Sequence, residues 1–371
     1  MAFVIASENL VNLVWYLGFA INVSVVLMVL QILAYRGIVV FRECRRGRVE
    51  KIWQPILLAS VEAVPADIPR LKRAEAEEFM TLWNYLHESL RDEALENLNR
   101  AARLAGADAA ARRLLLKRNT RRRLLAMTTL GNLRDRESWG ALGKFVNHRN
   151  AVVSLTAARG LMRIDPEKAI EIVMPLVAGR TDWSLEAVAA MLKKAGADII
   201  SLPLAKAIVA SCRRRAAVDA PTFEQTNPTA HVHAPRLVYL LRLAHPRFVT
   251  YVVRYALLAT DDIEIIAAAL KVYDDPAILP AVREMLQDSR WQVRVNAAQA
   301  IGRTGTSADE RLLINALRDE EWWVRYRAAQ ALANLPSVDA AKLEEYAAAQ
   351  TSEFSRDILR QVAAERRFLS S

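Results

Sequence analysis

The same pattern occurs twice near the C-terminal end of this chain, at a constant spacing. Residues 288–301 read DSRWQVRVNAAQAI and residues 319–332 read DEEWWVRYRAAQAL, so each position recurs 31 residues later. A second apolar stretch follows each copy, ADERLLINALRDE and then VDAAKLEEYAAAQ. A period of about 30 residues that contains two helices predicts an α-solenoid, because such a helical pair buries its apolar face only against its neighbours.

Weaker copies of the pattern extend toward the N-terminus. They lie at residues 121–133, 148–166, 182–196 and 263–270. With only 12 glycines and 13 prolines in 371 residues, and Ala, Leu, Arg and Glu abundant, the chain has the composition of an almost wholly helical protein. We therefore expect an all-α fold in which a helical array covers residues 71–371. The register is lost at residues 213–235, which we interpret as a loop insertion.

Several repeated positions have a structural explanation. Paired alanines let neighbouring helices approach closely, while Val293 and Val324 fill the shared core. An aspartate and an arginine six residues apart, in a turn and in the following helix, form a ladder of hydrogen bonds between successive repeats. On these grounds we assign repeat-building roles to a set of equivalent residues. The set comprises Asp288, Trp291, Arg294, Asp319, Trp322 and Arg325.

Three residues in the second copy have no counterpart of similar chemistry in the first copy. Trp323, Tyr326 and Arg327 align with a glutamine, a valine and an asparagine. Aromatic and arginine side chains are enriched at the centres of protein interfaces. These three residues are therefore candidates for partner binding, and the alternative is a capping role in a terminal repeat.

The N-terminal part contains a long stretch without charge. Residues 9–35 read NLVNLVWYLGFAINVSVVLMVLQILAY, which exceeds the roughly 20 residues that a helix needs to cross a bilayer. We expect an uncleaved, single-pass transmembrane helix here, preceded by a short extracytoplasmic segment at residues 1–8. The next residues are strongly basic, which predicts that the array faces the cytoplasm from the inner membrane. Residues 36–70 are expected to form a basic juxtamembrane linker in which Pro55 prevents one continuous helix.

Polar and small residues mark two faces of this predicted span. Gly18 and Asn22 are four residues apart and share one face, while Ser24 and Gln31 share another. Either face could pack against a membrane helix of a partner. The alternative is that single spans simply tolerate such residues.

The chain is basic, with 51 Lys and Arg against 41 Asp and Glu, for a formal net charge of +10. This balance favours contact with anionic lipid or with phosphorylated partners. The densest cluster lies between residues 100 and 123, near the predicted span, so an anionic membrane surface explains it at least as well as nucleic acid does. The candidate contact residues are Arg112, Arg113, Lys117, Arg118, Arg121 and Arg122. The alternative is an ordinary solvated helix face.

No motif of a familiar catalytic class is present. The sequence lacks a phosphate-binding loop, a dinucleotide-binding glycine turn, a nucleophile elbow, an HExxH helix and any CxxC pair. His231 and His233 lie in the predicted loop without further ligands at metal-binding spacing. Cys44 and Cys212 are far apart, so we expect no disulfide. We therefore expect no catalytic residue, no metal, no cofactor and no small-molecule substrate.

The units DxxWxVRxxAAxA[IL] resemble HEAT repeats, including those of the phycobilisome-lyase-type group. The likeness is specific at residues 288–302 and 319–332 and only periodic over the rest of residues 71–369. The whole layout, one span followed by LWNYLHESLRDEALENLNRAARLAG and a helical array, resembles bacterial membrane-anchored HEAT-repeat proteins associated with exopolysaccharide glycosyltransferases. This resemblance implies a non-catalytic scaffold that binds protein partners, with a membrane glycosyltransferase as the expected partner.

Other functions of HEAT-like proteins remain as alternatives. A basic nucleic-acid-binding protein, for instance of the DNA glycosylase kind, accords with the charge, and a bilin lyase accords with the repeat group. A membrane anchor weighs against both. HEAT-type iron hydroxylases carry repeated His-Glu pairs, whereas this chain has one such pair, His87 and Glu88, so we reject that activity.

Overall fold

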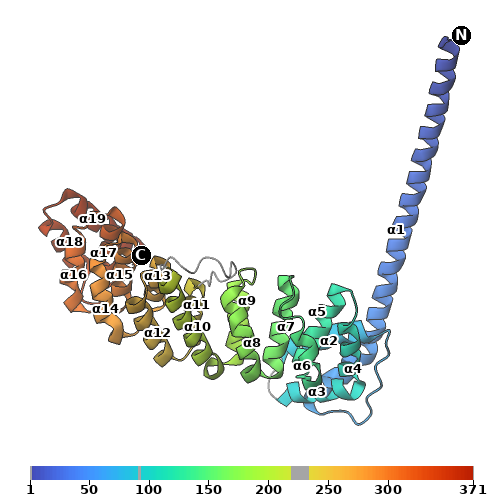
Figure 1. The fold of residues 1–371 in the computed structure, drawn as a ribbon, viewed down its shortest axis with the longest axis horizontal. Helices are drawn as coiled ribbons and strands as arrows, with labels where there is room; N and C mark the ends of the chain where they lie inside the picture. The colour runs from blue at the N-terminus through green and yellow to red at the C-terminus, as the bar shows by residue number, and fades with distance from the viewer. Residues whose placement is uncertain (1, 91–92, 219–233, 371) are drawn as a thin grey trace. The chain divides into compact units, whose positions relative to one another are not determined.

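A computed structural model describes residues 2–90, 93–218 and 234–370. Inside its helices the side chains of residues 2–14, 16–18, 20–21, 38–39, 41–42, 213–218, 234 and 369–370 are not described. Every element in the described ranges is helical and none is a strand, which confirms the all-α prediction (Figure 1). The chain divides into unit 1, residues 1–140, and unit 2, residues 141–371.

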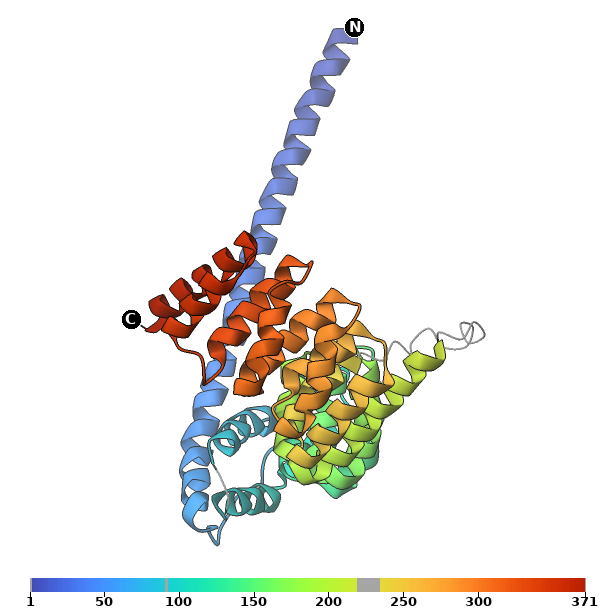
Figure 2. The same cartoon turned by 90° about the vertical axis from the view of Figure 1, so that its left-hand side faces the viewer.

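Unit 1 consists of one long helix and four short ones. Their bounds are α1 (Ala2–Glu62), α2 (Ala76–Ser89), α3 (Glu93–Ala105), α4 (Ala107–Leu115) and α5 (Thr120–Asn132), followed by the 3-10 turn η1 (Arg136–Ser138). Helices α2 and α3 pack on the C-terminal part of α1, and α5 packs on α2 and α4. Trp53, Phe79 and Trp83 fill this core, with the rings of Trp53 and Phe79 in edge contact at 4.7 Å. The rest of α1 extends away from α2–α5 in both views (Figures 1 and 2).

Helix α1 continues through Pro55, so the prediction that this proline interrupts the helix was wrong. A proline inside a helix costs about 3 kcal/mol through a lost hydrogen bond and a steric clash. Burial of Val49, Trp53 and Leu57 on the face of α1 that contacts α2 and α3 offsets this cost. Residues 36–62 are therefore helical and continuous with the predicted span.

The predicted transmembrane helix lies within α1, and in its first half, residues 9–21, only the side chains of Trp15 and Phe19 are described. Among the residues that the structure does describe, no helix combines the length and the apolar character needed to cross a membrane.

Unit 2 is built from consecutive helical pairs. Its α-helices are α6 (Trp139–Gly143, which begins at the end of unit 1), α7 (Ala151–Ile164), α8 (Pro166–Gly179), α9 (Leu185–Ala195), α10 (Ala197–Val218), α11 (Ala234–Leu240), α12 (Pro246–Ala259), α13 (Ile263–Val272), α14 (Leu279–Glu284), α15 (Trp291–Thr304), α16 (Glu310–Ala316), α17 (Trp322–Asn334), α18 (Ala340–Ala349) and α19 (Glu353–Ser370). Short 3-10 turns lie between them: η2 (Leu241–Leu243), η3 (Pro276–Ile278), η4 (Met285–Gln287) and η5 (Ser307–Asp309).

Both ends of the predicted loop at residues 213–235 are helical. Helix α10 ends at Val218 and α11 begins at Ala234, so residues 213–218 are helical. Three adjacent arginines are compatible with a helix, because arginine has a high helix propensity. Residues 219–233, with His231 and His233, lie outside the described residues.

The small residues of the repeat bring α15 and α17 close together. Ala297 and Ala298 in α15 and Ala328 and Ala329 in α17 are fully buried, as expected. The two backbones are close at Gly302, where an added Cβ atom would lie 2.7 Å from the Cα atom of Ala331. Alanines of the weaker copies, at positions 126, 157 and 158, are buried as well.

We expect Gly302→Ala to lower the free energy of unfolding by about 2 kcal/mol, because the methyl group forces two packed backbones apart. Gly179→Ala is the matched control, since no atom lies within 4 Å of its added Cβ atom. Urea unfolding followed by circular dichroism measures both. Equal midpoints for the two variants would contradict the close approach.

Candidate partner-binding surfaces

Arg294 joins two successive repeats. Its guanidinium forms two parallel hydrogen bonds of 2.8 Å to the carboxylate of Asp319, one repeat later. It also donates to the backbone carbonyls of Asp288 and Ser289, at 2.9 and 3.1 Å. The side chains of Arg294 and Asp319 are only 9% and 13% exposed, so this pair is largely shielded from water.

The equivalent residues in the next repeat keep part of this geometry. Arg325 donates to the backbone carbonyls of Asp319 and Glu320, each at 2.8 Å. Asp319 also accepts the backbone N–H of Glu321 at 2.9 Å, just before α17. In the preceding repeat Asp288 is paired with Arg290 at 2.7 Å. The predicted ladder therefore consists of aspartates that shape the turn and arginines that hold it.

Further arginines donate to neutral carbonyl groups at helix ends. Each acceptor lies in a neighbouring repeat, 29 to 33 residues away in the sequence. The pairs are Arg103 with Leu133, Arg242 with Lys271, Arg303 with Leu270, and Arg366 with Ala333. Cationic side chains suit the C-terminal ends of helices, where carbonyls lack helical partners. Part of the basic excess therefore belongs to the repeats and needs no anionic partner.

An exposed tryptophan surface, formed by Trp291, Trp322 and Trp323, lies at the beginning of α15 and α17. These side chains are 36%, 42% and 50% exposed. The rings of Trp322 and Trp323 meet edge to face at 4.7 Å. The sequence pattern predicts that Trp291 and Trp322 belong to the packing of the repeats. Both side chains remain partly in solvent, while the repeated valines and alanines form the buried contact, so the packing role of the two tryptophans stays a prediction.

Tyr326 and Arg327 have partners within the array. The Tyr326 ring stacks on Trp322 at 5.1 Å, and its hydroxyl lies 3.2 Å from a carboxylate oxygen of Glu365 in α19. Gln330 donates to the Tyr326 hydroxyl at 2.9 Å and accepts from Arg327 at 2.7 Å. The contact between Tyr326 and Glu365 connects α17 to α19, whereas the bonds of Gln330 lie within α17. Within the described ranges, the side chain of Trp323 makes a ring contact but no hydrogen bond.

Glu310 connects α16 to α18 in the same region. It pairs with Lys342 at 2.8 Å and accepts hydrogen bonds from Ser337 and Tyr346. The hydrogen bonds from Lys342, Ser337 and Tyr346 lower the pKa of Glu310 to about 2, because all three stabilise the charged form.

The six residues of the predicted anionic-surface cluster divide into two groups. Arg112 pairs with Asp108 at 2.6 Å and with Glu137, and Arg122 pairs with Glu77 at 2.7 Å. The other four are exposed and have no side-chain partner among the described residues. They are Arg113, Lys117, Arg118 and Arg121.

The predicted membrane-partner residues are only partly described. Gly18 lies outside the described side chains, whereas Asn22, Ser24 and Gln31 are exposed on α1. Large apolar side chains around them are exposed too. They are Val23, Val25, Val26, Leu27, Met28, Val29, Leu30, Ile32, Leu33 and Tyr35. Because consecutive residues of a helix point in directions 100° apart, this stretch is apolar and uncovered on every side.

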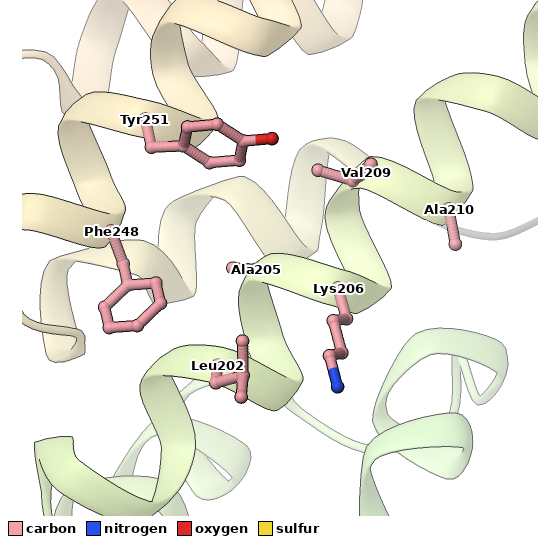
Figure 3. A pocket seen from close by; sticks show the side chains of 7 residues that line it. All are labelled: Leu202, Ala205, Lys206, Val209, Ala210, Phe248 and Tyr251. Carbon is pink, nitrogen blue, oxygen red and sulfur yellow. The ribbon is translucent and has the colours of Figure 1, made fainter.

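An apolar groove between α10 and α12 has no counterpart in the sequence predictions. It has a volume of about 560 Å³. In Figure 3 Phe248 and Tyr251 of α12 line one side of it, and Leu202 and Val209 of α10 line the other. The sequence does contain a pattern that could have indicated this groove, since Phe248, Tyr251 and Tyr255 recur at helical spacing. The rings of Tyr251 and Tyr255 stack 6.5 Å apart. Such a row of aromatic residues is equally typical of a buried helix face.

The cysteines and the possible metal ligands show no sign of a reactive site in the described residues. Cys44 and Cys212 are both free, and burial raises the pKa of the Cys212 thiol to about 11, which keeps it neutral. Across residues 2–90, 93–218 and 234–370, no three histidine, cysteine or acidic side chains are grouped so that they could hold a metal ion.

The repeats of unit 2 match a known family model. Residues 256–333 and 279–365 match the model described as HEAT repeats. Both specific copies of the sequence pattern lie within these ranges, so this C-terminal part of the chain is similar to HEAT repeats. No curated protein matches the chain. The matches carry no support for a phycobilisome lyase or for an exopolysaccharide association.

Several solved structures are similar to parts of the chain. Kap121p is 13% identical over 84% of this chain, with a TM-score of 0.46, and importin beta is 13% identical over 85%, with a TM-score of 0.37. This chain spans 37% and 46% of their lengths. Human deoxyhypusine hydroxylase in complex with glycerol is 18% identical over 78% of this chain and 96% of its own length, with a TM-score of 0.27. Values this low say nothing about activity or partners.

We expect Arg294→Gln to lower the free energy of unfolding by about 3 kcal/mol, because it leaves the shielded Asp319 carboxylate without its partner. Arg46→Gln is the matched control. Its pair with Glu50 is exposed on α1, and exposed pairs contribute little to stability. Urea unfolding measures both, and a wild-type midpoint for Arg294→Gln would contradict a structural ladder.

The lowered pKa of Glu310 predicts that part of the free energy of unfolding depends on pH. Its pKa is lowered on folding from 4.5 to about 2, so its contribution is complete above pH 4.5 and is lost as the pH falls toward 2. The stability difference between wild type and Glu310→Gln should therefore shrink over that window. The exposed Glu345→Gln on α18 is the control, and parallel pH profiles for wild type and Glu310→Gln would contradict the assignment.

Proposed function

We propose that this protein is a non-catalytic scaffold whose HEAT repeats hold a protein partner at a membrane. One observation carries the proposal: the same chain has an apolar helix segment exposed on every side and a repeat region with an exposed tryptophan surface. HEAT arrays present extended surfaces, and clustered tryptophans are typical of interface centres.

The membrane anchor is the part of α1 that includes residues 22–35. Complete burial of a large apolar side chain is worth about 1.5–3 kcal/mol, so a row of them has a strong tendency to leave water. The uncharged sequence from residue 9 onward and the basic residues after Tyr35 support a single pass of the inner membrane with the N-terminus outside. In this arrangement the repeats lie in the cytoplasm.

The partner is expected to be a membrane enzyme. The anchor can contact the part of such a protein inside the bilayer, and the repeats can contact its cytoplasmic part. The exposed Asn22, Ser24 and Gln31 support a helix contact within the bilayer. A polysaccharide-synthesising glycosyltransferase is the narrower proposal, and its only support is the resemblance in chain layout. Trp322 and Trp323 are the residues that we propose to carry most of the contact with the repeats.

The proposal predicts that affinity purification from detergent-solubilised membranes recovers one specific protein. Trp322→Ala with Trp323→Ala should weaken this binding about 30-fold, the loss expected for an interface hot spot, without releasing the protein from membranes. Tyr85→Ala, an exposed aromatic change in unit 1, is the matched control.

A triple variant, Leu27→Gln, Leu30→Gln and Leu33→Gln, should move the protein from the membrane fraction to the soluble fraction. If the wild type already fractionates as soluble, or if no specific protein is recovered with it, the proposed function is wrong.

A further inference from the structure

The turn between α4 and α5 exposes an apolar side chain among four cations. Leu116 is 81% exposed at the end of α4. Arg113, Lys117, Arg118 and Arg121 surround it in sequence and are all exposed. An exposed leucine in such a position costs solvation free energy and gains nothing from the fold.

The acidic residues near this turn are already paired. Asp108 and Glu137 bind Arg112, and Glu77 binds Arg122. The positive charge of the other four side chains is therefore not compensated among the described residues. A phosphate-bearing surface is complementary to this uncompensated charge.

The turn itself is firmly held. The side chain of Asn119 accepts the backbone N–H of Arg122 at 3.2 Å and begins α5. Arg123 donates from its guanidinium to the backbone carbonyl of Lys117 at 3.2 Å. The cations and Leu116 are thus presented on an ordered turn.

Two ion pairs place this turn beside α1. Arg122 of α5 binds Glu77 at the start of α2, and the neighbouring Glu78 binds Arg45 of α1 at 2.9 Å. Arg45 also donates to the backbone carbonyl of Ala74 at 3.1 Å. The α4–α5 turn therefore lies near the level of Arg45, at the end of unit 1 that faces the apolar segment of α1.

This level coincides with the lipid headgroups if α1 spans a membrane. Arg36 directly follows the uncharged span, and a long basic side chain near the end of a span extends along the helix to the headgroups. The sequence is apolar again from Gly37 to Phe41, so we place the edge of the hydrocarbon core at Phe41 rather than at Tyr35. Arg45 follows Phe41 by one helical turn, about 6 Å along the axis. The headgroup layer is about 5–7 Å thick on each side of the hydrocarbon core.

We propose that Leu116, Arg113, Lys117, Arg118 and Arg121 form a second membrane contact, in which the leucine enters the headgroup layer and the cations bind anionic lipid. This proposal rests on the proposed function, in which α1 anchors the protein in a membrane. The second contact would in addition fix the orientation of unit 1 relative to the bilayer. A single helix permits rotation of unit 1 about its axis, whereas a second contact holds the unit against the bilayer.

The test uses the full chain with Cys44→Ser and Leu116→Cys, labelled at residue 116 with an environment-sensitive fluorophore. The remaining Cys212 is buried and stays unlabelled. The protein is reconstituted into vesicles of phosphatidylcholine alone or mixed with phosphatidylglycerol. We expect a blue shift and quenching by spin-labelled lipid only in the anionic vesicles. Each change of a cation to glutamine should lower the ratio of lipid-embedded to water-exposed label about fivefold. This is the change in the equilibrium that the attraction of one cation to an anionic surface produces.

Tyr85→Cys is the control position. Tyr85 is exposed on α2 toward the end of unit 1 where Asn97 donates to the carbonyl of Glu62, away from the apolar segment. A label there should report water in both kinds of vesicle.

The outcomes separate the two proposals. If the protein floats with vesicles while the label at residue 116 reports water in both lipids, the second contact is wrong and the anchor stands. If the protein does not float with either vesicle, the proposed function fails and the second contact fails with it. A spectral shift on addition of duplex DNA, with none on anionic vesicles, also overturns the lipid contact.

Discussion

The bond between Arg294 and Asp319 is the interaction on which the array depends. Asp319 does two things at once, since it accepts the backbone N–H of Glu321 ahead of α17 and two N–H groups from the preceding repeat. Local turn geometry and the stacking of repeats are therefore coupled through one carboxylate. With the close approach at Gly302, this coupling holds α15 and α17 in a definite register.

Many arginines bind groups within the protein, so the net charge does not measure how much positive charge is available to a partner. A guanidinium that donates to the end of a neighbouring helix, as Arg303 and Arg366 do, keeps its charge but not its availability to a ligand. Others, such as Arg112, are occupied by carboxylates. The charge of +10 therefore overstates what a partner meets. Arg113, Lys117, Arg118 and Arg121 are among the cations that stay exposed, and they lie close together around one turn, which is why position matters more than total charge.

The repeat pattern predicted the core well and the surface poorly. Val293, Ala297 and Ala298 are buried because their small or branched side chains recur at helical spacing on one face. The tryptophans at the start of the same helices recur just as regularly, yet Trp291 and Trp322 are partly exposed. Regular recurrence shows that two positions are equivalent, but not whether the shared environment is core or solvent.

The sequence by itself determined the helical class, the two-helix repeat with its aspartate and arginine, and the uncharged stretch in α1, since these depend on local preference and spacing. Only the tertiary structure decided that Pro55 stays inside a helix, because burial of Trp53 and Leu57 outweighs a local cost. It also decided that Tyr326 binds Glu365 of α19. That contact joins residues far apart in the chain, and no local pattern encodes which distant helix will cover a given side chain.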